Sequence, residues 1–166
     1  MSSNDRYDLI VYGASGFTGQ YVLETFVKSE EYGKLSIAIA GRSTKKLEET
    51  LAKVGKLTDK DLSKIPIIVA DNENEDQLVQ MAMQAKGYCQ RCWTGHPLSP
   101  LGYALYRLYG EAVVKAAVEN GASHVDISGE PAWIESMQMK YSEQAKEKDV
   151  ITSYSACGWD SIPCVV

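Results

Sequence analysis

The stretch YDLIVYGASGFTG, from Tyr7 to Gly19, decides the fold of this chain, because an apolar strand pattern leads directly into regularly spaced glycines. Gly13, Gly16 and Gly19 follow the spacing Gly-x-x-Gly-x-x-Gly. In a strand-turn-helix unit the first glycine permits the tight bend, the second lets a pyrophosphate approach backbone N–H groups, and the third lets the helix pack closely. We therefore predict a dinucleotide-binding turn.

The other residues of the turn belong to the same predicted site: Ala14, Ser15, Phe17 and Thr18. The hydroxyl groups of Ser15 and Thr18 are suited to hydrogen bonds with phosphate oxygens. The alternative is a glycine-rich turn that holds no ligand. The strand before the turn, the amphipathic helix after it and a second strand beyond favour the dinucleotide site.

Strand and helix patterns alternate along the chain with short connections. Strands are predicted at 7–12, 36–40, 66–70, 124–127 and 150–154, and helices at 18–29, 45–54, 75–85, 110–120 and 132–148. This alternation is typical of βαβ units and of a mostly parallel sheet covered on both faces. We expect one α/β domain over residues 1–166 with a Rossmann-like, doubly wound sheet.

Residues 87–105 form an irregular insert where the alternation requires a fourth strand. A strand at that central position is normally a continuous apolar run, whereas this segment contains Pro97 and Pro100, which cannot donate to a central ladder. We expect the fourth strand to be disrupted or replaced. Its loss would expose the edges of two neighbouring strands, so self-association is predicted as a consequence.

The end of the second predicted strand favours NADP(H) over NAD(H). An NAD site usually has a carboxylate there, whereas this chain has Arg42 and Ser43, which suit a 2′-phosphate. Arg42 could instead be a solvated surface residue, and Ser43 could be a helix N-cap. Asp71, after the third strand, is placed either to accept a hydrogen bond from the adenine amino group or to cap the next turn, and both interpretations stay open.

Composition excludes several classes of partner. A net charge of −5 over 166 residues gives no long-range attraction for nucleic acid. No apolar window reaches the length of a membrane-spanning helix, and the polar start MSSNDR is unlike a signal peptide, so we expect an intracellular, cytoplasmic protein. The four cysteines are then expected as reduced thiols.

Other reactive side chains do not form a recognisable catalytic set. Cys89, Cys92 and His96 have partial zinc-site spacing but lack a fourth ligand, so we interpret them as incidental and predict no metal site. Ser128 and Glu130 could contact the nicotinamide or substrate, although a turn followed by a helix start explains them better. No catalytic residue is assigned.

The glycine turn, the block LYGEAVVKAAVENGASHVDISGEP and the later ACGWDSIP together resemble the saccharopine dehydrogenase-like oxidoreductases, a family related to trans-acting enoyl reductases. The resemblance implies an amino-terminal NADP-binding Rossmann domain and a link to lipid or glycolipid metabolism. It also implies association with lipid droplets, membranes or mitochondria. Family members continue into a substrate domain, so we expect this chain to be a truncated form.

Two functions from different classes follow. The first is the NADP(H)-binding domain of an oxidoreductase, whose small-molecule or lipid-related substrate is chosen by a domain outside this chain. The second is a non-catalytic module that binds a nucleotide or a partner. A poorly folded, self-associating product is the third alternative.

Overall fold

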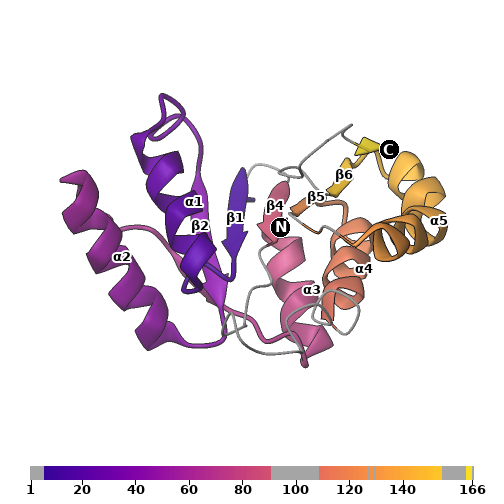
Figure 1. Ribbon diagram of the computed structural model, residues 1–166, viewed down its shortest axis with the longest axis horizontal. Helices are drawn as coiled ribbons and strands as arrows, with labels where there is room; N and C mark the ends of the chain where they lie inside the picture. Colours follow the sequence, from indigo (N-terminus) through magenta and orange to yellow (C-terminus); the bar gives the residue numbers. More distant parts are fainter. Residues whose placement is uncertain (1–5, 91–108, 127, 129, 155–163, 166) are drawn as a thin grey trace.

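The computed structural model describes residues 6–90, 109–126, 128, 130–154 and 164–165 (Figure 1). Its seven strands form one sheet in the order β3-β2-β1-β4-β5-β6-β7. Every neighbouring pair is parallel except β6 and β7. The strands are β1 (Leu9–Tyr12), β2 (Ile37–Gly41), β3 (Ile67–Val69), β4 (Gly87–Gln90), β5 (Ser123–Asp126), β6 (Thr152–Tyr154) and β7 (Cys164–Val165). The predicted doubly wound, mostly parallel α/β fold is confirmed.

Helices cover both faces of the sheet because successive strand residues point to opposite sides. The helices are α1 (Phe17–Lys28), α2 (Thr44–Thr58), α3 (Glu75–Met83), α4 (Glu111–Glu119) and α5 (Pro131–Glu147). Val11 and Ile39 pack with residues of α1 and α2, whereas Ile10 and Ala38 pack with residues of α3 and α4. In Figure 1, α1 and α2 lie to the left of β1, and α3, α4 and α5 lie to its right.

Helix α2 is longer than its sequence predicts. The prediction ended the helix before Gly55, but the helix continues to Thr58 and ends at Asp59, which has a φ of 53°. Gly55 does not stop the helix. A Cβ at this position would lie 2.8 Å from the carbonyl oxygen of Lys60, so the glycine allows close packing of the following loop.

The fourth strand is present, which corrects the expectation that it is disrupted or replaced. Strand β4 pairs with β1 on one side, from Ile10↔Tyr88 to Tyr12↔Gln90, and with β5 along its full length on the other. The sequence argument failed because Pro97 and Pro100 come after Gln90, and because a strand of four residues with a partner strand on each side needs no long apolar run. The prediction that β1 and β5 have unpaired edges is therefore wrong. Self-association stays a prediction, but unpaired strand edges beside β4 no longer support it.

A polar cluster holds the start of β4 beside β1. The Asp8 carboxylate accepts hydrogen bonds from Lys86 Nζ at 2.7 Å and from the Ser36 hydroxyl and backbone N–H at 2.7 and 2.8 Å. These contacts, led by the Lys86 hydrogen bond, hold the pKa of Asp8 well below its usual range. The backbone of Tyr7 also pairs with Gln84 and Lys86 at 2.8 Å each. Asp8 thus joins the beginnings of three strands.

Candidate functional site

The carboxyl ends of the parallel strands bring the predicted site residues to one edge of the sheet, which is where ligands bind in open α/β folds. Gly13 follows β1 with a φ of 76°, in the left-handed region that glycine favours. Its N–H donates to the Ala40 carbonyl at 2.9 Å, and its own carbonyl accepts from the Gly16 N–H at 3.0 Å. The turn is therefore anchored to the neighbouring strand β2.

Gly19 lies where the first turn of α1 crosses the glycine turn. A Cβ at this position would lie 2.3 Å from the Gly13 carbonyl oxygen and 2.8 Å from Ala14 Cα. Ala14 itself is fully buried. The glycine is thus required for close packing, but against the turn rather than against the body of the strand.

The amino end of α1 is open to an anion. Gly16 occupies the N-cap position and has no side chain to cap the helix, and no acidic residue stands in the first helical turn. Uncapped N–H groups and the helix dipole together favour a negatively charged ligand at such an end. Ser15 and Thr18 are half-buried at this position, and the ring of Phe17 is 70% exposed.

Gln20 and Lys53 support the turn, and sequence reasoning missed both. The Gln20 side chain donates to the Ser15 carbonyl at 3.4 Å and accepts from Lys53 Nζ of α2 at 2.7 Å. The pair joins the turn to the helix that follows β2. Their separation in sequence gave no signal, because the contact exists only once α1 and α2 lie side by side.

The end of β2 presents positive charge to the same edge. Arg42 is exposed and forms no hydrogen bond or ion pair with the described part of the chain. Ser43 is the N-cap of α2, and its hydroxyl accepts a hydrogen bond from the Lys46 N–H at 3.4 Å. Ser43 therefore makes the helix-capping contact, and its contact with a 2′-phosphate stays a prediction. Lys45 and Lys46, which the prediction omitted, stand exposed in the first turn of α2, where there is no acidic residue.

Asp71 follows β3 and makes the contacts of a turn residue. Its Oδ1 accepts from the Glu73 N–H at 3.2 Å, and its own N–H donates to Gln77 Oε1 at 3.0 Å. The carboxylate is half-buried at the carboxyl edge of the sheet. The turn-capping interpretation is thus seen directly, while contact with an adenine stays a prediction.

The end of β5 is polar and buried. Asp126 Oδ1 accepts from the Ser128 N–H at 2.9 Å, and the Ser128 hydroxyl accepts from the Glu130 N–H at 3.4 Å. These contacts form the predicted turn before α5. His124 lies within the strand, fully buried, with Nε2 3.8 Å from Asp126 Oδ2, and burial lowers the pKa of His124 to about 3.

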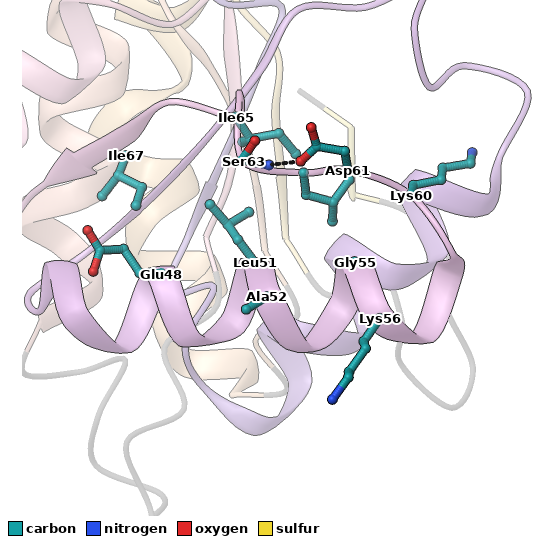
Figure 2. A pocket seen from close by; sticks show the side chains of 11 residues that line it. Glu48, Leu51, Ala52, Gly55, Lys56, Lys60, Asp61, Ser63, Ile65 and Ile67 are labelled. Carbon is teal, nitrogen blue, oxygen red and sulfur yellow. Dashed lines mark hydrogen bonds between the residues drawn. The ribbon is translucent and has the colours of Figure 1, made fainter.

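A hollow of about 450 Å³ lies away from this edge, between α2 and residues 60–67. Figure 2 shows Leu51, Ile65 and Ile67 around it, with Asp61 hydrogen-bonded to the Ser63 N–H and Lys56 directed outward. The hollow includes neither the glycine turn nor Arg42, so it is separate from the predicted dinucleotide site.

Several predicted features fall outside the described residues. The Cys89 backbone belongs to β4, but Cys92, His96 and the ACGWDSIP block lie in segments that are not described. Within the described residues, no cluster of three metal-ligating side chains occurs and no helix is long and apolar enough to cross a membrane.

The chain was compared with protein-family models and with curated proteins, and both comparisons found matches over most of its length. Residues 9–152 match the family model described as the saccharopine dehydrogenase NADP binding domain. The chain is 60% identical over 158 residues to a lipid droplet localized protein of Caenorhabditis elegans, covering 95% of this chain and 34% of that protein. It is 44% identical over 170 residues to a human saccharopine dehydrogenase-like oxidoreductase, covering 98% of this chain and 37% of that protein. The chain thus spans about a third of the length of the curated relatives it matches.

Among solved structures, the chain is similar to apo saccharopine dehydrogenase (L-Glu forming) of Saccharomyces cerevisiae, with a TM-score of 0.60. That match covers 90% of this chain and 27% of the yeast chain at 14% identity. At this identity the likeness supports the fold alone.

Proposed function

Because the chain belongs to the saccharopine dehydrogenase NADP-binding domain family, we propose that its turn from Gly13 to Gly19 binds the pyrophosphate of NADP(H) and that Arg42 and Ser43 bind the 2′-phosphate. The observation that carries this assignment is the uncapped amino end of α1. Its N–H groups adjoin the glycine turn, against which Gly19 packs so closely that a Cβ there would lie 2.3 Å from the Gly13 carbonyl oxygen. A diphosphate supplies the negative charge that this end lacks.

The cation beside the site explains the choice of cofactor. Gly41 ends β2 where an NAD site has a carboxylate, and the exposed Arg42 follows it. A guanidinium binds a phosphate through two parallel N–H bonds, and the Ser43 hydroxyl can donate to a third oxygen. Lys45 and Lys46 add positive charge at the same helix end. These positive charges and the Ser43 hydroxyl complement a 2′-phosphate, whereas a neutral 2′-hydroxyl would gain little from them.

The reaction we propose for the complete oxidoreductase is hydride transfer between the nicotinamide and a small-molecule or lipid-related substrate. The name of the nematode relative supports a lipid-related context and association with lipid droplets. Substrate choice is expected to come from sequence that the longer relatives have beyond the third matched here. This chain then supplies cofactor binding, and no residue of it is assigned to proton transfer.

A non-catalytic nucleotide-binding module is the second candidate for this chain alone. It is favoured by the end of β5, where Asp126 and Ser128 are buried and hydrogen-bonded within the turn rather than presented at the surface. Such groups shape the edge of a nucleotide site but are poorly placed to exchange protons with a substrate. Hydride transfer from NADPH to a carbonyl or enoyl acceptor by the purified chain would exclude this candidate.

Titration of the purified chain with NADPH and NADH tests the cofactor assignment. We expect tighter binding of NADPH, and we expect Arg42→Ala to lower NADPH affinity by about 10- to 100-fold while leaving NADH affinity unchanged, since charge-assisted hydrogen bonds contribute about 1.5 to 3 kcal/mol. Lys34→Ala, at an exposed position in the loop before β2, is the matched control. Equal affinities for the two dinucleotides in the native chain would remove Arg42 from the site.

A further inference from the structure

Tyr12, the last residue of β1, is a polar group in an otherwise apolar strand. Its side chain is 4% exposed and packs in a core cluster with Ala38, Ala40 and Ala70. A buried phenol needs a hydrogen-bond partner, since leaving its O–H unpaired costs free energy. The Tyr12 hydroxyl donates to Asn72 Oδ1, in the loop that follows β3.

This contact crosses the whole width of β2. Strand β2 lies between β1 and β3, and Tyr12 is in register with Ala40. On the face that α3 and α4 cover, β2 has only the small side chains of Ala38 and Ala40, both fully buried. Because these two side chains are small, the ring of Tyr12 can extend over β2 as far as the end of β3.

The loop that Tyr12 reaches contains the predicted adenine contact. Asp71 precedes Asn72, and its carbonyl accepts from the Asn74 N–H at 3.0 Å. Asp71 Oδ1 accepts from the Glu73 N–H, and the Asp71 N–H donates to Gln77 of α3. The loop is thus held from α3 on one side and from β1, through Asn72, on the other.

We propose that Tyr12 is a positioning residue for the adenine end of the site. Through Asn72 it fixes the loop 71–74 so that the Asp71 carboxylate accepts a hydrogen bond from the adenine amino group. The carboxyl end of β1 thereby serves two parts of the cofactor: Gly13, which follows the strand, turns toward the pyrophosphate, and Tyr12 holds the adenine loop. This inference rests on the proposed dinucleotide site.

The experiment compares NADPH with its deamino analogue, in which hypoxanthine replaces adenine and the amino donor is absent. For the native chain we expect tighter binding of NADPH than of the analogue. Tyr12→Phe removes only the hydroxyl and should lower NADPH affinity about fivefold, as expected for one neutral hydrogen bond, while leaving affinity for the analogue unchanged. A general loosening of the fold would weaken both ligands equally.

Two substitutions at position 72 supply the rescue test. Asn72→Asp retains an oxygen that accepts from the phenol and should keep the preference for NADPH over the analogue. Asn72→Leu removes the acceptor and should reproduce Tyr12→Phe, with no further loss in the double variant. Asp71→Ala, which deletes the proposed contact itself, should abolish the preference.

Failure of the inference and failure of the proposed site are distinguishable. A native chain that binds neither dinucleotide overturns the site and the inference together. A native chain that prefers NADPH, combined with Tyr12→Phe that lowers both affinities equally or changes neither, overturns the role of Tyr12 and leaves the site in place.

Discussion

The two halves of the sheet contrast in how their sequences relate to their structure. In the half that contains β1 and β2, the strands are the apolar runs LIVY and IAIAG, and β2 is buried throughout. In the half that contains β4, β5 and β6, the strands are GYCQ, SHVD and TSY, and the buried side chains include His124, Asp126 and Thr152. One sheet thus combines an apolar half with a polar half.

The difference shows two ways of specifying a strand. Strands β1 and β2 are recognisable from local pattern alone, because burial on both faces selects continuous apolar residues. Strand β4 is specified by its neighbours, since it hydrogen-bonds on both sides and its start is held by Asp8 and Tyr7. The apolar half forms the glycine turn, and the polar half completes the sheet beside it.

Glycine substitutions test this contrast most strongly. Gly19→Ala places a methyl group 2.3 Å from the Gly13 carbonyl oxygen, so the turn or the helix must move. We expect a loss of about 3 kcal/mol in the free energy of unfolding, measured by urea denaturation, together with at least about tenfold weaker NADPH binding.

Gly87→Ala is the matched control in the polar half. There the nearest atoms to an added Cβ lie at 3.7 Å, an ordinary contact distance. We expect a change within about 0.5 kcal/mol and unaltered NADPH affinity. Similar losses in the two variants would show that the two halves tolerate backbone crowding alike and would remove the contrast.

The local structure of the apolar half was largely predictable from sequence. The glycine turn and strands β1 and β2 follow from residue types whose local requirements are strict, such as the φ of 76° at Gly13, whereas the role of Arg42 stays a prediction. The same reasoning left Ser43 and Asp71 with two interpretations each, because a hydroxyl or carboxylate that caps a turn can also contact a ligand. Their turn contacts are now visible, and their ligand contacts stay predictions.

The rest was not predictable because it depends on contacts between distant segments. Strand β4 lacks the apolar pattern of a central strand, and the Asp8–Lys86 ion pair that fixes its start joins residues 78 positions apart. The support of the turn by Gln20 and Lys53 depends on the packing of α1 against α2, and the Tyr12–Asn72 bond crosses an intervening strand. Local periodicity contains no information about any of these.

Acid should weaken the polar half first, because of His124. Burial lowers the pKa of this imidazole from 6.5 to about 3, so between these values the unfolded chain binds a proton that the folded chain does not. The free energy of unfolding is therefore unaffected by His124 above pH 6.5. It falls by about 1.4 kcal/mol per pH unit as the pH drops from 6.5 toward 3. Hydrogen exchange at pH 4.5 should accelerate in β5 before it does in β1.

His124→Gln removes the titrating group and should flatten this pH dependence of the free energy of unfolding. The control is His96→Gln, which removes the second of the two histidines of the chain and should leave the dependence at position 124 intact. An unchanged slope in His124→Gln would assign the acid sensitivity to other groups.

The smallest effect is expected at Asp8, where the two halves meet. Its lowered pKa means that the carboxylate stabilises the fold above the unfolded pKa of 3.8 and that this stabilisation is lost as the pH falls below that value. Asp8→Asn should therefore cost about 1 kcal/mol at pH 7, since the Lys86 contact is partly exposed and screened, and should speed hydrogen exchange at the start of β4. Glu24→Gln breaks a similarly exposed i,i+4 pair within α1 and is the matched control, with a smaller expected cost and no effect on β4. If Asp8→Asn left hydrogen exchange in β4 unchanged, the backbone hydrogen bonds to β1 and β5 would be enough to hold that strand. The Asp8 side chain would then have no part in placing β4.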